Sequence, residues 1–186
     1  MVTWWSSLQW WPSLVGIGLA AFIALGMSAG SAEASTLAAS GLVYLGAAAL
    51  QKPSAAWPLF LLTFLLITAS KVAIRAGLVS IDATWLLIGL AIAFVVYGLM
   101  RGATHPAGGL RRQAIAMVVC GLAAAIALIV SGKLGAYLVA AGLLGHAAWD
   151  VYHHWANKVV VRSMAEFCFV LDTLLALAIV VATVRS

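Results

Sequence analysis

Charged residues are scarce in this chain, and that scarcity is the first constraint on its fold. They make up 8% of the 186 residues, whereas a soluble domain carries about 25%. Apolar residues reach 65%, so there is too little polar surface to cover a globule in water. We therefore expect lipid to cover much of the molecule, which excludes a water-soluble domain.

Paired cysteines and clustered positive charge are also missing. Cys120 and Cys168 both lie in apolar runs, without a Cys-x-x-Cys pair. This argues against a disulfide framework or a zinc ribbon and favours buried free thiols. The basic residues are spread over short loops rather than gathered on one face, so no nucleic-acid partner is predicted. Residues 164–184 contain no lysine for a Schiff base, which argues against a retinal pigment.

The chain instead contains several long apolar segments. A spanning helix needs about 20 mostly apolar residues, and seven segments come near this length. They run over about 11–30, 35–51, 56–76, 83–101, 112–131, 134–155 and 163–184. The sequence predicts an all-α, polytopic transmembrane helix bundle of seven spans, with residues 1–186 forming a single integral membrane domain. The segment 35–51 is short and rich in Ala, Gly and Ser, and six spans remain if it does not cross.

The distribution of Lys and Arg between alternate loops predicts an orientation. With seven spans, six of these residues fall on the N-terminal side and three on the other. Positive loops favour the cytoplasm, so we expect a cytoplasmic N-terminus in a bacterial-type plasma membrane. No Lys or Arg precedes the first apolar stretch, which favours a retained helix over a signal peptide. Trp4, Trp5, Trp10 and Trp11 are expected to anchor this end among the lipid headgroups.

Histidine and acidic side chains gather in the sixth segment. The stretch from Gly145 to His154 holds three of the four histidines and one of only five acidic residues. At 100° per residue, His146, Asp150 and His153 share a helical stripe about 60° wide, with His154 at its margin. Because ionisable groups are costly in hydrocarbon, these residues are candidates for function.

Asp172 in the seventh segment is expected at the same depth as His146. The two lie thirteen residues on either side of Val159, in the connection between the segments. In a tight antiparallel hairpin each would lie about 20 Å from the loop, near the middle of a core about 30 Å thick. The same count places Asp150 level with Cys168. Two helices are therefore predicted to point polar groups at one another.

Imidazole and carboxylate groups together suit zinc, iron or manganese. We therefore predict a divalent-metal site with His146, Asp150 and His153 as ligands. Asp172 would be a fourth ligand, or the catalytic acid–base partner of a metal-bound water. Three ligands and an open position allow water to be activated. The leading hypothesis is therefore metal-assisted hydrolysis of a lipid or another membrane-embedded substrate.

The residues from His146 to Asp150 have the pattern His-x-x-x-Asp, which is similar to the zinc-binding half-motif of cation diffusion facilitators. The resemblance implies a zinc-binding pair at these two positions. It covers five residues, and the second acidic helix motif of that family is absent.

Two further functions stay open for the same residues. A His–Asp pair without metal can relay protons in a proton-coupled transporter. The cluster can also fix the packing of two helices in a structural or assembly subunit. Small residues such as 123–125 permit close packing, either in a homo-oligomer or against other chains of a membrane complex.

Other polar residues have simpler explanations. Ser163 followed by Glu166 predicts a capping box at the start of the last helix. Lys71 and Arg75 are expected to reach the headgroups with their long side chains, and Arg75 is placed to pair with Asp82. An anionic-substrate site at Lys71 and Arg75 is the functional alternative.

Overall fold

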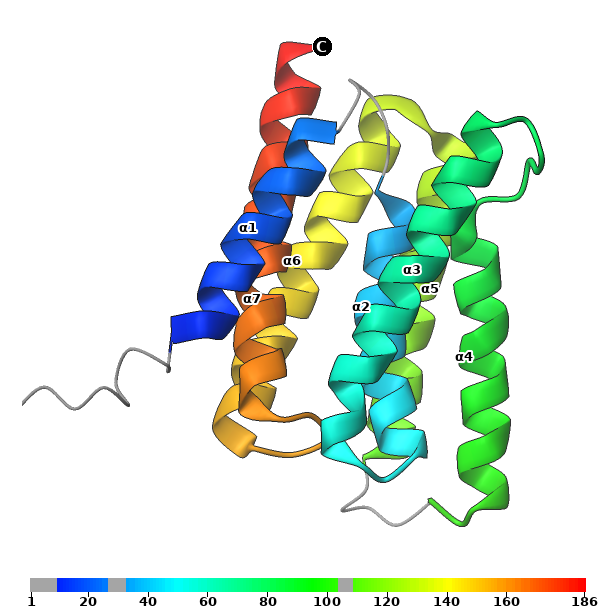
Figure 1. Ribbon diagram of the computed structural model, residues 1–186, viewed down its shortest axis with the longest axis vertical. Helices are drawn as coiled ribbons and strands as arrows, with labels where there is room; N and C mark the ends of the chain where they lie inside the picture. Colours follow the sequence, from blue (N-terminus) through cyan, green and yellow to red (C-terminus); the bar gives the residue numbers. More distant parts are fainter. Residues whose placement is uncertain (1–9, 27–32, 104–108) are drawn as a thin grey trace, which may run out of the picture.

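The computed structural model describes residues 10–26, 33–103 and 109–186, which form an all-helical bundle (Figure 1). All seven predicted apolar segments coincide with helices, so the all-α prediction is confirmed. The α-helices are α1 (Trp11–Gly26), α2 (Ala34–Ala49), α3 (Ala56–Arg75), α4 (Ala83–Met100), α5 (Leu110–Val130), α6 (Gly132–Ala156) and α7 (Arg162–Arg185), with a short 3-10 helix, η2 (Pro53–Ala55), before α3.

Five of these helices are long and apolar enough to cross a membrane, which indicates an integral membrane protein. They are α3 together with η2, and α4, α5, α6 and α7. The other two, α1 and α2, have 16 residues each. A helix of that length rises about 24 Å, less than a hydrocarbon core about 30 Å thick. Helix length therefore supports five of the seven predicted spans.

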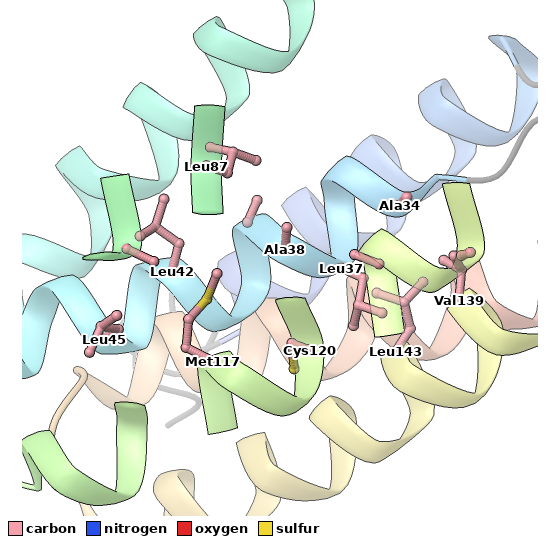
Figure 2. Packing of buried hydrophobic residues seen from close by; sticks show 14 of the residues in the cluster. Ala34, Leu37, Ala38, Leu42, Leu45, Leu87, Met117, Cys120, Val139 and Leu143 are labelled. Carbon is pink, nitrogen blue, oxygen red and sulfur yellow. The ribbon is translucent and has the colours of Figure 1, made fainter. Parts of the chain in front are cut away.

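The short helix α2 lies at the centre of the bundle. It packs against α3, α4, α5 and α6, and all its residues except Thr36 are buried. Figure 2 shows side chains of α2, among them Leu37 and Leu42, packed with Leu87 of α4, Met117 of α5 and Leu143 of α6. A helix enclosed on every side has no polar face. Its many Ala, Gly and Ser residues let the neighbouring helices approach closely.

Two glycines bring α6 against its neighbours. A Cβ atom on Gly142 would lie 2.5 Å from Cδ2 of Leu37 in α2. A Cβ atom on Gly135 would lie 2.6 Å from the backbone oxygen of Ala127 in α5. At Gly135 a larger residue would meet fixed backbone, and at Gly142 it would require the Leu37 side chain to move, so both glycines permit α6 to pack closely.

The helices α6 and α7 form an antiparallel hairpin and pack closely along their length (Figure 1). α6 ends at Asn157, which adopts a left-handed conformation with φ of 48°. α7 begins after Val161, whose backbone is extended. The connection is therefore short, as the predicted depth match between His146 and Asp172 requires.

The capping box predicted at the start of α7 is wrong. The residue at the N-cap position is Val161, which leaves Ser163 inside the first turn of the helix. The Ser163 hydroxyl accepts a hydrogen bond from Trp57 Nε1 at 3.2 Å. Glu166 accepts one from Ser13 Oγ at 2.5 Å. These two polar residues join α7 to α3 and α1 instead of capping the helix.

The predictions for the surface residues are met in part. Asp82 caps the start of α4 by accepting a hydrogen bond from the backbone N–H of Thr84 at 2.8 Å, and it forms no ion pair with Arg75. Trp10 and Trp11 are exposed, as an interfacial anchor requires. The other two tryptophans of that anchor, Trp4 and Trp5, lie outside the described residues.

Candidate functional site

Three of the predicted site residues converge between α6 and α7. One ligand atom from each of His146, Asp150 and Asp172 lies within 4.8 Å of the others, and all three residues are buried. His146 Nδ1 lies 2.9 Å from Asp172 Oδ2 and 3.4 Å from Asp150 Oδ2. The predicted depth match of His146 and Asp172 is therefore confirmed. It arises because the two residues lie equally far from a short hairpin connection.

The central helix α2 holds the other oxygen of each carboxylate. Tyr44 donates its hydroxyl hydrogen to Asp150 Oδ1 at 2.5 Å. The Ser40 hydroxyl lies 3.3 Å from Asp172 Oδ1 and donates to it or to the carbonyl of Thr36, at 3.2 Å. Ser40 and Tyr44 are four residues apart and so share one face of α2. Each carboxylate therefore has one oxygen oriented by α2 and the other directed toward His146.

Two atoms of the cluster have no hydrogen-bond partner within the described part of the chain. They are His146 Nε2 and Asp150 Oδ2, and both are buried. The single hydrogen on His146 Nδ1 cannot serve both carboxylates, and Asp172 is the nearer. Buried polar atoms are normally satisfied, so these two mark a place where the protein surroundings alone are incomplete.

Positive charge is also missing around the two carboxylates. Within the described residues, no Lys or Arg forms an ion pair with Asp150 or Asp172. Both aspartates have 0% exposure. An uncompensated buried carboxylate is strongly unfavourable. The cluster therefore requires protons or a cation to be stable within the bundle.

His153, the third predicted ligand of the stripe, does not join the cluster. Its Nε2 lies 2.9 Å from Gln113 Nε2 and its Nδ1 lies 3.0 Å from the carbonyl oxygen of Trp149. The ring of Tyr44 packs edge-on against both His146 and His153, at 5.0 Å from each. The two histidines are seven residues apart, about 10.5 Å along a helix. That rise separates them too far for one small ion, although they share a face.

Two cavities flank the cluster. The larger, of about 510 Å³, has Ser40 and Cys168 in its wall and lies between α1, α2, α3 and α7. The smaller, of about 170 Å³, is lined in part by Asp150 and His154 and lies between α6 and α7. The cluster is therefore buried, but not remote from space that a small molecule or water can occupy.

Sequence reasoning missed Ser40 and Tyr44, which support the cluster from α2, and Gln113, which contacts His153 from α5. Ser40 and Tyr44 lie in the segment considered the weakest span, and Gln113 lies near the start of α5. A signal was present for the first two, since polar residues four apart, at 36, 40 and 44, share one face of this helix. Gln113 had no such partner in its own segment, and only the packing of α5 on α6 connects it with His153.

Comparison with known proteins shows no relatives: no family model matches the chain, and neither a curated protein nor a solved structure is significantly similar to it.

Proposed function

We propose that this integral membrane protein binds a divalent metal ion through His146, Asp150 and Asp172 and uses it to hydrolyse a membrane-embedded substrate. The observation that carries the proposal is the convergence of one imidazole and two carboxylates in a buried site, where no Lys or Arg of the described residues pairs with either carboxylate. Zinc, iron and manganese are the metals that suit this set of ligands.

Charge balance supports a divalent ion. With His146 neutral, the two aspartates give the cluster a charge of minus two, which an ion of charge plus two neutralises. Ligation requires a neutral imidazole and ionised carboxylates. One ion therefore stabilises both aspartates at once and supplies a partner for the unsatisfied Asp150 Oδ2.

The distances support tetrahedral binding. In a tetrahedral zinc site with bonds of about 2.0–2.2 Å, neighbouring ligand atoms lie about 3.3–3.6 Å apart. The distance from His146 Nδ1 to Asp150 Oδ2 is 3.4 Å and that to Asp172 Oδ2 is 2.9 Å. The first of these distances falls within that range and the second is about 0.4 Å shorter. Tyr44 and Ser40 already orient the carboxylates from outside the ligand set, as the second shell of a metal site does.

Three protein ligands leave one position open, and catalytic zinc sites share this arrangement. A bound divalent ion would lower the pKa of a water in that position and so supply a nucleophile at neutral pH. In this arrangement Asp172 binds the ion through Oδ2, while Ser40, which lines the larger cavity, lies 3.3 Å from its other oxygen, Oδ1. That cavity is mostly apolar and gives a lipid-like substrate a route to the neighbourhood of the cluster.

The first test is the metal content of the purified protein, measured by elemental mass spectrometry. We expect about one equivalent of zinc, iron or manganese per chain in the wild type, and a loss of most of it in His146→Ala and Asp172→Asn. Two neighbouring histidines provide matched controls. His154→Ala and His153→Ala are expected to retain the metal. Loss of metal in His153→Ala would instead favour His153 as a ligand, as the sequence predicts. Substoichiometric metal in the wild type, unchanged in Asp172→Asn, removes the metal from the proposal.

The second test detects hydrolysis whichever membrane lipid is the substrate. Metal-loaded protein is incubated with a total membrane lipid extract in water enriched in oxygen-18, and the lipids are then analysed by mass spectrometry. Hydrolysis places a water-derived oxygen in one product, which we expect with the wild type and not with Asp172→Asn. Absence of any labelled product, in a protein shown to contain metal, rejects the hydrolase and leaves the metal site standing.

We also propose that α1 and α2 cross the membrane, giving seven spans with a cytoplasmic N-terminus in a bacterial-type plasma membrane. Successive helices alternate in direction in Figure 1, so their connections fall at two opposite ends of the bundle. The end that holds Arg101, Arg111 and Lys158 is the more basic and is proposed to face the cytoplasm. Reporter fusions after α1, α2 and α7 test this orientation.

A proton-coupled transporter is the second candidate, because protons can balance the same charges. Protonation of His146 and of one aspartate also neutralises the cluster, and the His146–Asp172 hydrogen bond of 2.9 Å supplies a path for a proton. This candidate predicts proton flux in liposomes that Asp172→Asn abolishes and that chelation leaves unchanged. Flux that is absent, or that depends on metal, counts against it.

A further inference from the structure

The larger cavity has a composition of its own that the metal cluster does not explain. It occupies about 510 Å³ between α1, α2, α3 and α7, a size within the range of about 300–1,000 Å³ typical of ligand sites. Most of its wall is apolar, with Phe22, Ile23 and Phe64 among the contributing residues. Its charged residues are Glu33, Lys71 and Arg75.

These charged residues gather at one end of the cavity. Glu33 precedes α2, and Arg75 ends α3 with Lys71 one turn before it. Lys71 Nζ pairs with Glu33 Oε2 at 2.6 Å, and the Glu33 side chain is 6% exposed. Within the described part of the chain, Arg75 forms no ion pair. One acidic and two basic side chains leave this end with a net positive charge.

The apolar part has the depth of one lipid leaflet. Along α3, the cavity wall runs from Lys71 to Phe60, a distance of about 16 Å by helical rise. One leaflet contributes half of a hydrocarbon core about 30 Å thick. A positively charged mouth above an apolar slot of that depth matches a lipid with an anionic headgroup and an extended acyl chain.

The surroundings provide access from the bilayer. α1 packs on α7, whereas α3 packs on α2 and α4. The ribbons of α1 and α3 are separated across this region in Figure 1, and the two helices meet near their starts, where the rings of Trp11 and Trp57 lie 5.1 Å apart. Ser40 lines the cavity, and its hydroxyl lies 3.3 Å from Asp172. A lipid chain seated here would end beside the His–Asp cluster.

We propose that this cavity is a binding site for a membrane lipid with an anionic phosphate headgroup, held at the headgroup by Arg75 and the Lys71–Glu33 pair. The site requires no metal, so it stands or falls separately from the proposed hydrolase. It also gives a role to the two basic residues, beyond reaching toward the membrane surface.

The test measures lipid binding to delipidated protein by native mass spectrometry. The probes are dioleoyl phosphatidic acid and dioleoyl phosphatidylcholine, which share their acyl chains and differ in headgroup charge. We expect phosphatidic acid to bind more tightly, and Arg75→Gln to weaken its binding about fivefold, the value of one basic residue near an anionic lipid. Lys133→Gln, an exposed basic residue away from the cavity, is the matched control and is expected to have no effect.

A second pair of variants tests whether the acyl chain of the lipid lies in this cavity. Thr68 lines the cavity and is exposed, so Thr68→Trp is expected to block the cavity without disturbing the core and to abolish phosphatidic acid binding. Leu65→Trp adds the same bulk on the outer face of α3, where Leu65 is 54% exposed, and is expected to bind normally. Equal binding of the two lipids, or normal binding by Thr68→Trp, overturns the proposal. Binding of inorganic phosphate as tightly as phosphatidic acid would overturn it as well. Removal of metal by chelation is expected to leave lipid binding unchanged.

Discussion

Tyr44 is the residue through which the candidate metal site can be tested most selectively. Its hydroxyl donates to Asp150 Oδ1 at 2.5 Å, while its ring packs against His146 and His153. The substitution Tyr44→Phe removes the hydroxyl and keeps the ring, so the packing at the centre of α2 is preserved. Any change in metal affinity then reports on the orientation of the Asp150 carboxylate.

Two independent estimates give the size of the effect. A hydrogen bond to a charged group contributes about 1.5–3 kcal/mol. Loss of an outer-shell partner of a metal ligand lowers metal affinity about 10- to 100-fold, which corresponds to about 1.4–2.7 kcal/mol. Because Asp150 is fully buried, it has no contact with bulk water that would replace the lost donor. We therefore expect Tyr44→Phe to raise the Kd for zinc by about 10- to 100-fold.

The assay is a competition titration of the metal-free protein with zinc and a chromogenic chelator in detergent. Tyr137→Phe serves as the matched control, because Tyr137 lies on the same α6 helix as the ligands but is 41% exposed. Its Kd should equal that of the wild type. If Tyr44→Phe and Tyr137→Phe bind zinc equally well, Asp150 is not a ligand oriented from α2, and the reasoning is refuted.

The remaining predictions concern stability, measured as thermal unfolding in detergent. In metal-free protein, Asp172→Asn removes one of two buried like charges and should raise the melting temperature, whereas in the presence of metal the same change removes a ligand and should lower it. The same sign in both conditions would contradict charge balance by a metal ion. Gly135→Ala places a Cβ atom 2.6 Å from the Ala127 carbonyl oxygen and should cost about 1–3 kcal/mol through overpacking. Gly145→Ala on the same helix is the control, because no atom of the described chain lies within 4 Å of the added Cβ. It should not lower the stability. Equal stability of the two variants would disprove the close approach of α5 and α6.

Much of the fold follows from local properties of the chain. Hydropathy is a property of consecutive residues, so the helix positions could be predicted, and the predicted ends of 56–76 and 83–101 differ from those of α3 and α4 by one residue. The pairing of His146 with Asp172 was equally accessible, because a short antiparallel connection brings residues equidistant from it to the same depth.

The failures at the site have physical causes that differ from one residue to the next. His153 shares the stripe of His146, but helical rise alone separates the two by about 10.5 Å, so angular position was not a sufficient criterion. The Ser163 capping box failed because the N-cap is Val161, two residues earlier, and its backbone is extended. In each case a sequence pattern was correct about residue type and wrong about distance or boundary.

The sequence by itself determined that this chain forms apolar helices and that His146, Asp150 and Asp172 can meet, since both depend on neighbours in the chain or on one short connection. Only the tertiary structure decided that α2 lies at the centre and that Ser40 and Tyr44 complete the cluster. It also decided that His153 binds Gln113 instead. These contacts join residues 40 to 132 positions apart. They depend on which helices pack together and on how each is rotated, and this is settled by the close fit of small residues throughout the bundle.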